Sequence, residues 1–306
     1  MTNLLDRAIV RLLPAVPKPV VKRIADRYIA GTELADACHV VKRLNAGGKM
    51  ATIDVLGEEI ANREEALAIV DAYDDVSAAI ESEALDSNLS VKLTGLGLKL
   101  DYDFCLANME AVLERAGRFV RIDMEDSSCT EDTLRLYRAL RADGYDQVGI
   151  VLQAYLRRTL TDIRELAGLT PNVRICKGIY VEPPEVAFQE PGEVRANFVA
   201  ALDLLLEQGS YVGIATHDEW LIEQALALID RDGRGREEYE FQMLLGVRER
   251  RASELVSEGH RVRIYVPFGR QWYLYSLRRL QENPKIAGYI AADTLGRLVP
   301  GRNGRG

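Results

Sequence analysis

The sequence has few of the residues that build metal sites and disulfide frameworks. Of 306 residues, only four are cysteine and three are histidine. The cysteines are scattered and form no CxxC motif, which favours a reduced, cytoplasmic compartment over a secreted disulfide scaffold. His39, His217 and His260 do not pair at metal-ligand spacing, so we expect no zinc or iron site.

The chain also lacks long apolar runs and an excess of positive charge. A membrane span needs about 18 consecutive apolar residues, and no such run occurs. The first residues include an early acid and prolines but no small-residue cleavage site, so we expect no signal peptide. The formal charge of −8 disfavours a nucleic-acid partner, because phosphate binding needs a dominant basic face.

What the sequence does contain is a repeated alternation of strand and helix patterns. Amphipathic helical patterns, such as 156–169 and 220–231, lie between short apolar runs. Such alternation predicts a parallel sheet, and eight units in one chain of this length predict a closed α/β barrel. The predicted strands are 50–55, 89–93, 119–123, 147–152, 173–177, 211–215, 239–243 and 262–266.

The chain divides into three predicted parts: a helical arm over 1–45, a barrel over 46–295 and a disordered tail over 296–306. The start of the arm is locally basic, which fits either packing on the barrel or contact with an anionic membrane surface. Segment 181–195 has three prolines and four glutamates and follows a predicted strand, so we expect an active-site loop or lid there.

The ends of the predicted strands carry charged residues where a barrel places its active site. The third strand ends at Asp123, and Glu125 and Asp126 follow it. Without suitable histidines, pairing of these carboxylates with arginine is favoured over metal binding. The fifth strand contributes Arg174 and Lys177. Because a buried unpaired arginine is costly, Arg174 either forms a structural ion pair with Asp123 or Glu125 or faces an anionic or electron-rich ligand.

Other strand ends carry polar groups suited to a heterocycle or a phosphate. Gln153 offers both a donor and an acceptor. Thr216 and His217 open a predicted helix whose N-terminal amides would attract phosphate, although Thr216 could simply be an N-cap. Tyr265 ends the eighth strand and fits either packing or a site. The TGLGLK segment has Leu100 in place of the third glycine of GxGxxG, so it supports no Rossmann site.

A helical pattern after the eighth strand contains two adjacent arginines. Tyr275 lies three and four residues before Arg278 and Arg279, and Glu282 lies four residues after Arg278. Neighbouring helical side chains point about 100° apart, so both arginines can hold one ligand only if the helix lies across it. A solvated surface helix explains the pair equally well.

Taken together, eight motifs resemble the flavin-dependent proline dehydrogenases, most closely the short monofunctional bacterial ones. The resemblance runs from Val91 to Pro284 in the order of the family. It implies a distorted (βα)8 barrel with the last helix over the barrel mouth. The motifs are VKLTGLG, RIDMED, VLQAYLRR, VRICKGIY, IATHDE, FQMLLG, RIYVPFG and YLYSLRRLQENP.

The resemblance also implies how the substrate, L-proline, is held. Lys92, Arg278 and Arg279 would bind the carboxylate of proline, while Tyr265 and Tyr275 would pack against its ring. In the family, a tyrosine at position 265 is associated with proline over 4-hydroxyproline.

The remaining implied roles concern the cofactor, FAD. Asp123 would organise the cations near the reacting region, and Arg174 would stabilise the reduced flavin. Val181 replaces a tryptophan of many bifunctional relatives, so the flavin contacts there can differ. The implied cofactor-binding residues are Met124, Gln153, Arg174, Lys177, Gly178, Ile179, Thr216, His217, Gln242 and Glu282, the last of which would also pair with Arg278 or a neighbouring cation.

The implied reaction is oxidation of L-proline to 1-pyrroline-5-carboxylate, the first step of proline degradation to glutamate, with electrons passed to a quinone. A cytoplasmic enzyme of this kind could touch the inner face of the cell membrane. Two alternatives stay open at this point. One is a class I aldolase or lyase that forms a Schiff base on Lys177. The other is a non-catalytic barrel that acts as a binding module.

Overall fold

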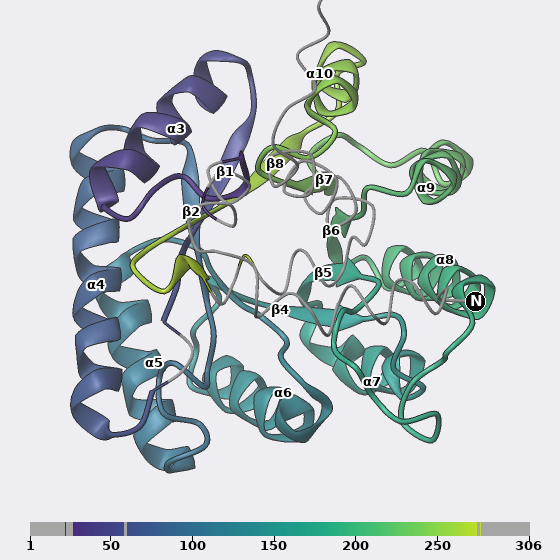
Figure 1. Cartoon of the computed structure of the whole chain (residues 1–306). Coiled ribbons are helices and arrows are strands. Elements are labelled where there is room, and N and C mark those ends of the chain that lie inside the picture. The colour runs from purple at the N-terminus through teal and green to yellow at the C-terminus, as the bar shows by residue number, and fades with distance from the viewer. Residues whose placement is uncertain (1–21, 23–26, 58–59, 274–275, 277–306) are drawn as a thin grey trace, which may run out of the picture.

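The chain folds into a closed barrel of eight parallel strands, which confirms the predicted fold class. The computed structural model describes residues 22, 27–57, 60–273 and 276. The strands pair in chain order, and β8 pairs back with β1 (Figure 1). The strands are β1 Met50–Val55, β2 Ser87–Val91, β3 Val120–Ile122, β4 Val148–Gln153, β5 Asn172–Cys176, β6 Tyr211–Ala215, β7 Tyr239–Leu244 and β8 Val262–Phe268.

Helices follow the strands and form the outer layer of the barrel (Figure 1). Asn62 and Asp101 cap α4 and α5, because their side chains accept hydrogen bonds from the backbone N–H groups of Glu65 and Phe104. The described helices are α3 Leu34–Ala46, α4 Arg63–Ser82, α5 Tyr102–Ala116, α6 Ser127–Ala142, α7 Thr159–Leu166 with the 3-10 turn η2 Ala167–Leu169, α8 Pro191–Glu207, α9 Glu219–Arg231 and α10 Glu249–Ser257.

Several strand boundaries depart from the prediction, and at β2 the reason is a pair of buried polar residues. The ranges 50–55 and 211–215 agree with β1 and β6, whereas β2 begins two residues before the predicted 89. Ser87 and Asn88 are polar but buried, so the apolar pattern missed them. The helix predicted over 156–169 starts too early, because residues 156–158 form the turn before α7.

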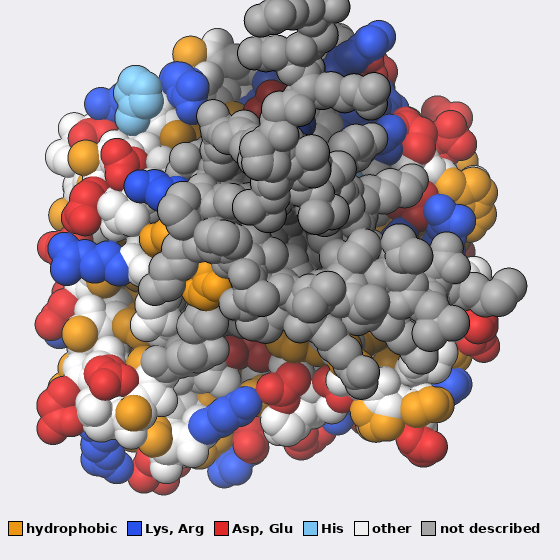
Figure 2. Space-filling view, viewed as in Figure 1, with side chains coloured by type: hydrophobic (Ala, Val, Ile, Leu, Met, Phe, Trp, Pro, Cys, Tyr) orange, Lys and Arg blue, Asp and Glu red, His pale blue; other side chains and the backbone are white. Residues whose placement is uncertain are grey.

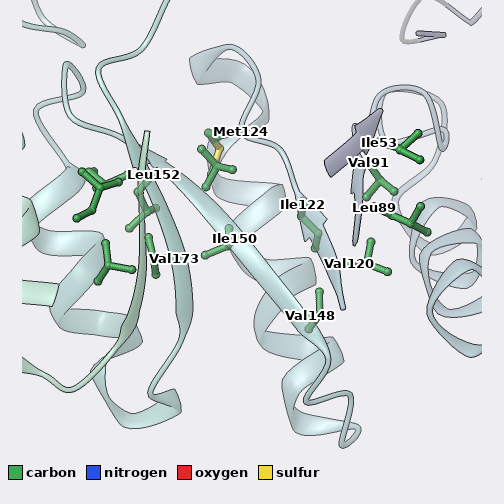
Figure 3. Packing of buried hydrophobic residues seen from close by; sticks show 14 of the residues in the cluster. Ile53, Leu89, Val91, Val120, Ile122, Met124, Val148, Ile150, Leu152 and Val173 are labelled. Atoms are coloured by element: carbon green, nitrogen blue, oxygen red, sulfur yellow. The ribbon is translucent and has the colours of Figure 1, made fainter. Parts of the chain in front are cut away.

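The core lies between the strands and the helices. Alternate strand residues point outward, as a strand requires, and these are apolar and buried. Figure 3 shows Leu89 and Val91 of β2, Val120 of β3 and Ile150 of β4 in this layer, and all four are fully buried. This packing fixes the register of each strand, because a one-residue slip would turn its apolar set into the barrel.

The inward-facing residues are largely polar, which is why the interior can hold a site. Two glycines give space to large side chains there. A Cβ on Gly149 would lie 2.5 Å from Phe119 Cζ and 2.7 Å from Arg121 Nη1, and a Cβ on Gly213 would collide with the amide of Gln242. These strand positions therefore need glycine for close packing inside the barrel.

The outer position beside β8 and β1 is taken by α3, which precedes the barrel in sequence. This helix packs against both strands (Figure 1). It belongs to the range predicted as a helical arm, and the domain boundary near residue 45 stays a prediction. The rest of the arm, apart from residues 22 and 27–33, lies outside the described residues. So do the last helix predicted over the barrel mouth and the tail 296–306.

Acidic and basic side chains are intermixed around the rim of the face seen in Figure 2.

Within the described ranges, no helix combines the length and hydropathy needed to cross a bilayer.

Candidate active site

Asp123, just after β3, is the centre of a buried charged cluster at the strand ends. Its Oδ1 accepts hydrogen bonds from Arg174 Nη1 at 2.7 Å and Ser90 Oγ at 2.6 Å. Its Oδ2 accepts from Tyr265 OH at 2.7 Å and Lys92 Nζ at 3.3 Å. Burial by itself would raise the pKa of Asp123, but Lys92 and Arg174 hold that pKa below its usual value. Asp123 is therefore a carboxylate that keeps two cations in place.

Lys92 directs all three of its ammonium protons to groups of this cluster. Besides Asp123, its Nζ lies 2.9 Å from Asp54 Oδ1 and 3.1 Å from Tyr265 OH. Burial opposes its charge, but Asp54, Tyr265 and Asp123 together raise the pKa of Lys92 well above its usual value. Since an ammonium has three donors, Lys92 would have to exchange one partner to bind another carboxylate directly.

Asp54 is a member of the cluster that the sequence analysis missed. It is fully buried, and its Oδ2 accepts no hydrogen bond. Burial raises the pKa of Asp54, and the charge of Lys92 opposes that rise. An acid two residues after Thr52 on a predicted strand shares its face, so the alternation could have placed Asp54 inside the barrel.

Arg174 links this cluster to a second polar layer deeper in the barrel. Its Nε donates to Gln242 Oε1, and Gln242 Nε2 donates to Glu240 Oε1 at 2.6 Å. Arg263 Nε donates to the same oxygen of Glu240 at 2.7 Å. The ion pair with Asp123 is thus one of the two readings that the sequence left open for Arg174. Arg174 also lies over the ring of Tyr265, with its Cζ 5.2 Å from the ring centroid.

Arg121 completes the lower layer. Its Nη1 donates to the backbone oxygen of Asn172 at 2.6 Å and that of Ile150 at 3.0 Å. Burial, together with the charges of Arg174 and Arg263, lowers the pKa of Arg121 to about 9. It therefore stays charged near neutral pH and orders the barrel floor beneath Asp123.

The turn after β3 joins several strand ends. Met124 O accepts from Gln153 Nε2 at 3.2 Å. Glu125 accepts from the Thr94 backbone N at 3.0 Å and from its hydroxyl, and burial raises the pKa of Glu125. Ser127 begins α6, whose N-cap is Asp126. The RIDMED motif therefore acts as a junction and not only as a source of carboxylates.

Gln153 has an unused acceptor at the barrel mouth. The side chain is 3% exposed, and its Oε1 is buried without a hydrogen-bond partner. An unpaired buried amide oxygen is costly. A donor from a ligand at the mouth would satisfy it, which fits the heterocycle expected for this position.

Lys177 lies at the end of β5 and pairs with the residue before α9. Its Nζ lies 2.5 Å from Asp218 Oδ2, and Arg195 Nε lies 2.7 Å from the same oxygen. Partial burial would raise the pKa of Asp218, but hydrogen bonds from Arg195 and Lys177 lower it to about 2.

The lowered pKa of Asp218 predicts a pH effect on stability. A depressed folded-state pKa stabilises the fold above the unfolded pKa of about 3.9, and the contribution is lost as pH falls towards about 2. We expect Asp218→Asn to lower the unfolding free energy at pH 7 and to lose less of it between pH 5 and pH 3 than the wild type does. Denaturant melts at each pH would measure this, and equal pH dependence in both proteins would contradict it.

Thr216 and His217 do not open the helix as predicted. The helix α9 begins at Glu219 with Asp218 as N-cap, and Thr216 Oγ1 accepts from the backbone N of Asp218 at 3.1 Å. Thr216 is therefore not the N-cap, because the chain turns for two further residues. His217 Nε2 accepts from the Leu244 backbone N at 2.9 Å, which ties the ends of β6 and β7 together.

Gly178 has a backbone reason to be glycine. Its φ is +98°, and a Cβ there would overlap the ring of Tyr155. Ile179 follows with 43% exposure. Both residues lie beside Lys177 on the loop after β5, near the barrel mouth.

The remaining predicted site residues cannot be placed. Tyr275, Arg278, Arg279 and Glu282 lie outside the described residues. Among the residues that are described, no group of three or more histidine, cysteine, aspartate or glutamate side chains could hold a metal ion.

A closed parallel barrel with a buried charged cluster at its strand ends defines the class: an α/β-barrel enzyme with its site at the barrel mouth. The family model for proline dehydrogenase matches residues 37–291. The chain therefore belongs to the proline dehydrogenase family and is an oxidoreductase, which confirms the resemblance found in the motifs.

Relatives of similar length agree with this assignment. The chain is 39% identical over 274 residues to proline dehydrogenase 1 of Bacillus subtilis subsp. natto, covering 89% of this chain and 90% of that protein. It is 34% identical over 279 residues to a proline dehydrogenase of Deinococcus radiodurans, covering 89% of this chain and 90% of that protein.

A solved structure supports the fold. Proline utilization A from Bdellovibrio bacteriovorus, inactivated by N-propargylglycine, superposes with a TM-score of 0.81 at 23% identity. The match covers 95% of this chain and 38% of that longer chain. At this identity the likeness concerns the barrel alone.

Proposed function

We propose that this enzyme oxidises L-proline to 1-pyrroline-5-carboxylate with FAD as cofactor and a quinone as final electron acceptor. The observation that carries the proposal is the Asp123 cluster, which gathers Lys92, Arg174 and Tyr265 at the strand ends of a proline dehydrogenase family member.

The residues at the barrel mouth fit a bound flavin. The unpaired Gln153 Oε1 can accept from a ring N–H. Further contacts would come from Met124, Arg174 and Gln242 near the ring, with Lys177, Gly178, Ile179, Thr216 and His217 around the rest of the cofactor and Glu282 beside them. When bound, the flavin supplies the hydride acceptor, which is chemistry that amino-acid side chains lack.

The chain itself supplies charge and orientation. Arg278 and Arg279 would hold the carboxylate of proline, because guanidinium groups bind carboxylates bidentately. Lys92 would join them by exchanging one of its three partners, and Tyr265 and Tyr275 would wall the ring. Proline must bind with a neutral amine, since a protonated nitrogen has no lone pair to assist loss of hydride from the adjacent carbon. The positive charges of Arg278, Arg279 and Lys92 beside the substrate would favour that neutral form.

The position of α3 supports a last helix over the barrel mouth. A regular barrel covers β8 and β1 with the helix that follows β8. Here α3 already packs on both strands from outside. We therefore expect the predicted helix with Arg278 and Arg279 to cover the strand ends and not the outer wall beside β8 and β1.

The Schiff-base alternative is disfavoured by the surroundings of Lys177. Its Nζ is ion-paired with Asp218 at 2.5 Å. That contact occupies the Nζ, whereas a Schiff-base lysine needs its amine free to attack a carbonyl carbon.

The proposed function is tested by the visible spectrum of the purified protein. We expect a flavin absorption band that bleaches when L-proline is added without an acceptor and returns when a quinone is supplied. A colourless protein without proline-dependent dye reduction would overturn the proposal and favour a binding module. Contact with the inner face of the cell membrane is a separate proposal, tested by flotation with anionic liposomes after deletion of either end.

We expect Arg278→Met and Arg279→Met to raise the KM for proline about a hundredfold each, because each removes a charged hydrogen bond to the carboxylate. Flavin content should be unchanged. Steady-state kinetics measure the effect, with Arg164→Met on α7 as a control. Normal KM values in both variants would rule out Arg278 and Arg279 as the groups that bind the carboxylate.

A further inference from the structure

The loop after β5 is fastened to the start of α6 by one carboxylate. The half-buried Glu182 accepts from the Ser127 backbone N at 2.7 Å through Oε1 and from Ser127 Oγ at 2.6 Å through Oε2. Both groups belong to the first residue of α6, where an N-terminal helix dipole favours a negative charge. Glu182 thus makes two charge-assisted hydrogen bonds to an element 55 residues away in sequence.

Other contacts hold the loop on both sides of Glu182. Before it, Lys177 pairs with Asp218 at 2.5 Å. After it, Pro184 O accepts from Arg157 Nε at 2.7 Å, and Ala187 forms an isolated antiparallel bridge with Leu156. The stretch 178–181 therefore lies between two anchored residues, Lys177 directly before it and Glu182 directly after it.

The stretch that Glu182 anchors matters because of where it lies. It follows Arg174 of β5 and Lys177 in the chain, and through Glu182 it is bonded to α6, the helix after the Asp123–Met124 turn. Ser127 is three residues after Met124, whose oxygen binds Gln153 at 3.2 Å. The Glu182–Ser127 contact therefore connects two loops that flank the barrel mouth.

We propose that Glu182 is a positioning residue that clamps segment 178–181 against α6 and so sets how firmly the cofactor is retained. This inference rests on the proposed function, since Gly178 and Ile179 are among its cofactor contacts. Glu182 acts through the loop and not by touching the substrate.

The test compares Glu182→Ala with Glu185→Ala, a matched control because Glu185 is an exposed glutamate in the same loop. Amide hydrogen exchange reports on the loop independently of activity, and the recovery of free-flavin fluorescence after dilution gives the cofactor release rate. We expect Glu182→Ala to speed exchange at Ser127 and across 178–182 about tenfold, and flavin release by a similar factor, because two bonds to a charged acceptor are lost. Glu185→Ala should change neither, and Glu182→Gln should be intermediate.

Unchanged exchange in Glu182→Ala would overturn the clamp. Faster exchange with an unchanged flavin release rate would overturn its link to the cofactor. Exchange in the β-strands serves as the internal reference, because a general loss of stability would speed exchange there as well. A wild-type protein that contains no flavin would instead overturn the proposed function, and the exchange measurement would still decide whether Glu182 holds the loop.

Discussion

Replacing Arg174 with alanine is expected to lower kcat for proline oxidation about 10²- to 10³-fold, the usual cost of removing a preorganised electrostatic group. Arg174 is buried in the barrel interior and is fixed on one side by Asp123 at 2.7 Å and on the other by Gln242. A guanidinium held in this way does not need to reorganise as charge develops nearby. Its loss should therefore act on the chemical step more than on proline binding.

Stopped-flow reduction of the enzyme by proline measures the effect on Arg174→Ala. The control is Arg138→Ala, because Arg138 forms an ion pair of 2.9 Å with Glu165 at the surface and should leave the rate unchanged. A variant with a raised KM and a normal reduction rate would argue against the proposed position of Arg174 beside the flavin.

Asp123→Asn is expected to destabilise the fold by about 3–5 kcal/mol, because it leaves the buried charges of Lys92 and Arg174 without their shared carboxylate. The pKa of Asp123 is lowered in the fold. Its ionised form therefore adds stability above the unfolded pKa, and that stability is lost as pH falls through the folded-state pKa. The variant should lose this part of the pH dependence and should have little activity.

Urea unfolding at pH 7 and at a series of lower pH values measures this difference. Asp203→Asn is the matched control, since Asp203 pairs with Arg231 at 2.6 Å at the surface. It should cost no more than about 1 kcal/mol. Equal losses in the two variants would contradict the central role of Asp123.

The sequence predicted the outward, apolar residues of the strands more reliably than the inward, polar ones. The outward residues of each strand form the pattern that located β1 and β6 correctly and the other strands within a few residues. Inward polar residues at strand starts, such as Asn88 and Asn172, resemble loop residues until the barrel closes around them, and the predicted strands left them out. Their burial depends on partners from distant strands, which local periodicity does not reveal.

The candidate site was predicted in the same uneven way. Asp123, Arg174 and Tyr265 were named from their places at strand ends and Lys92 from the family resemblance, and the structure brings these four together. Asp54 was missed because it lies within an otherwise ordinary strand. Glu182 was also missed, because its partner Ser127 is 55 residues earlier and no motif joins the two.

The pairing of β1 with β8 has a consequence for how the chain reaches its native state. Met50 of β1 lies opposite Arg263 of β8, so the seam can form only after more than two hundred residues have left the ribosome. Until then the β1 edge has unsatisfied backbone groups and can pair with another chain. Slow acquisition of structure and concentration-dependent aggregation during refolding are the expected costs of this long-range closure.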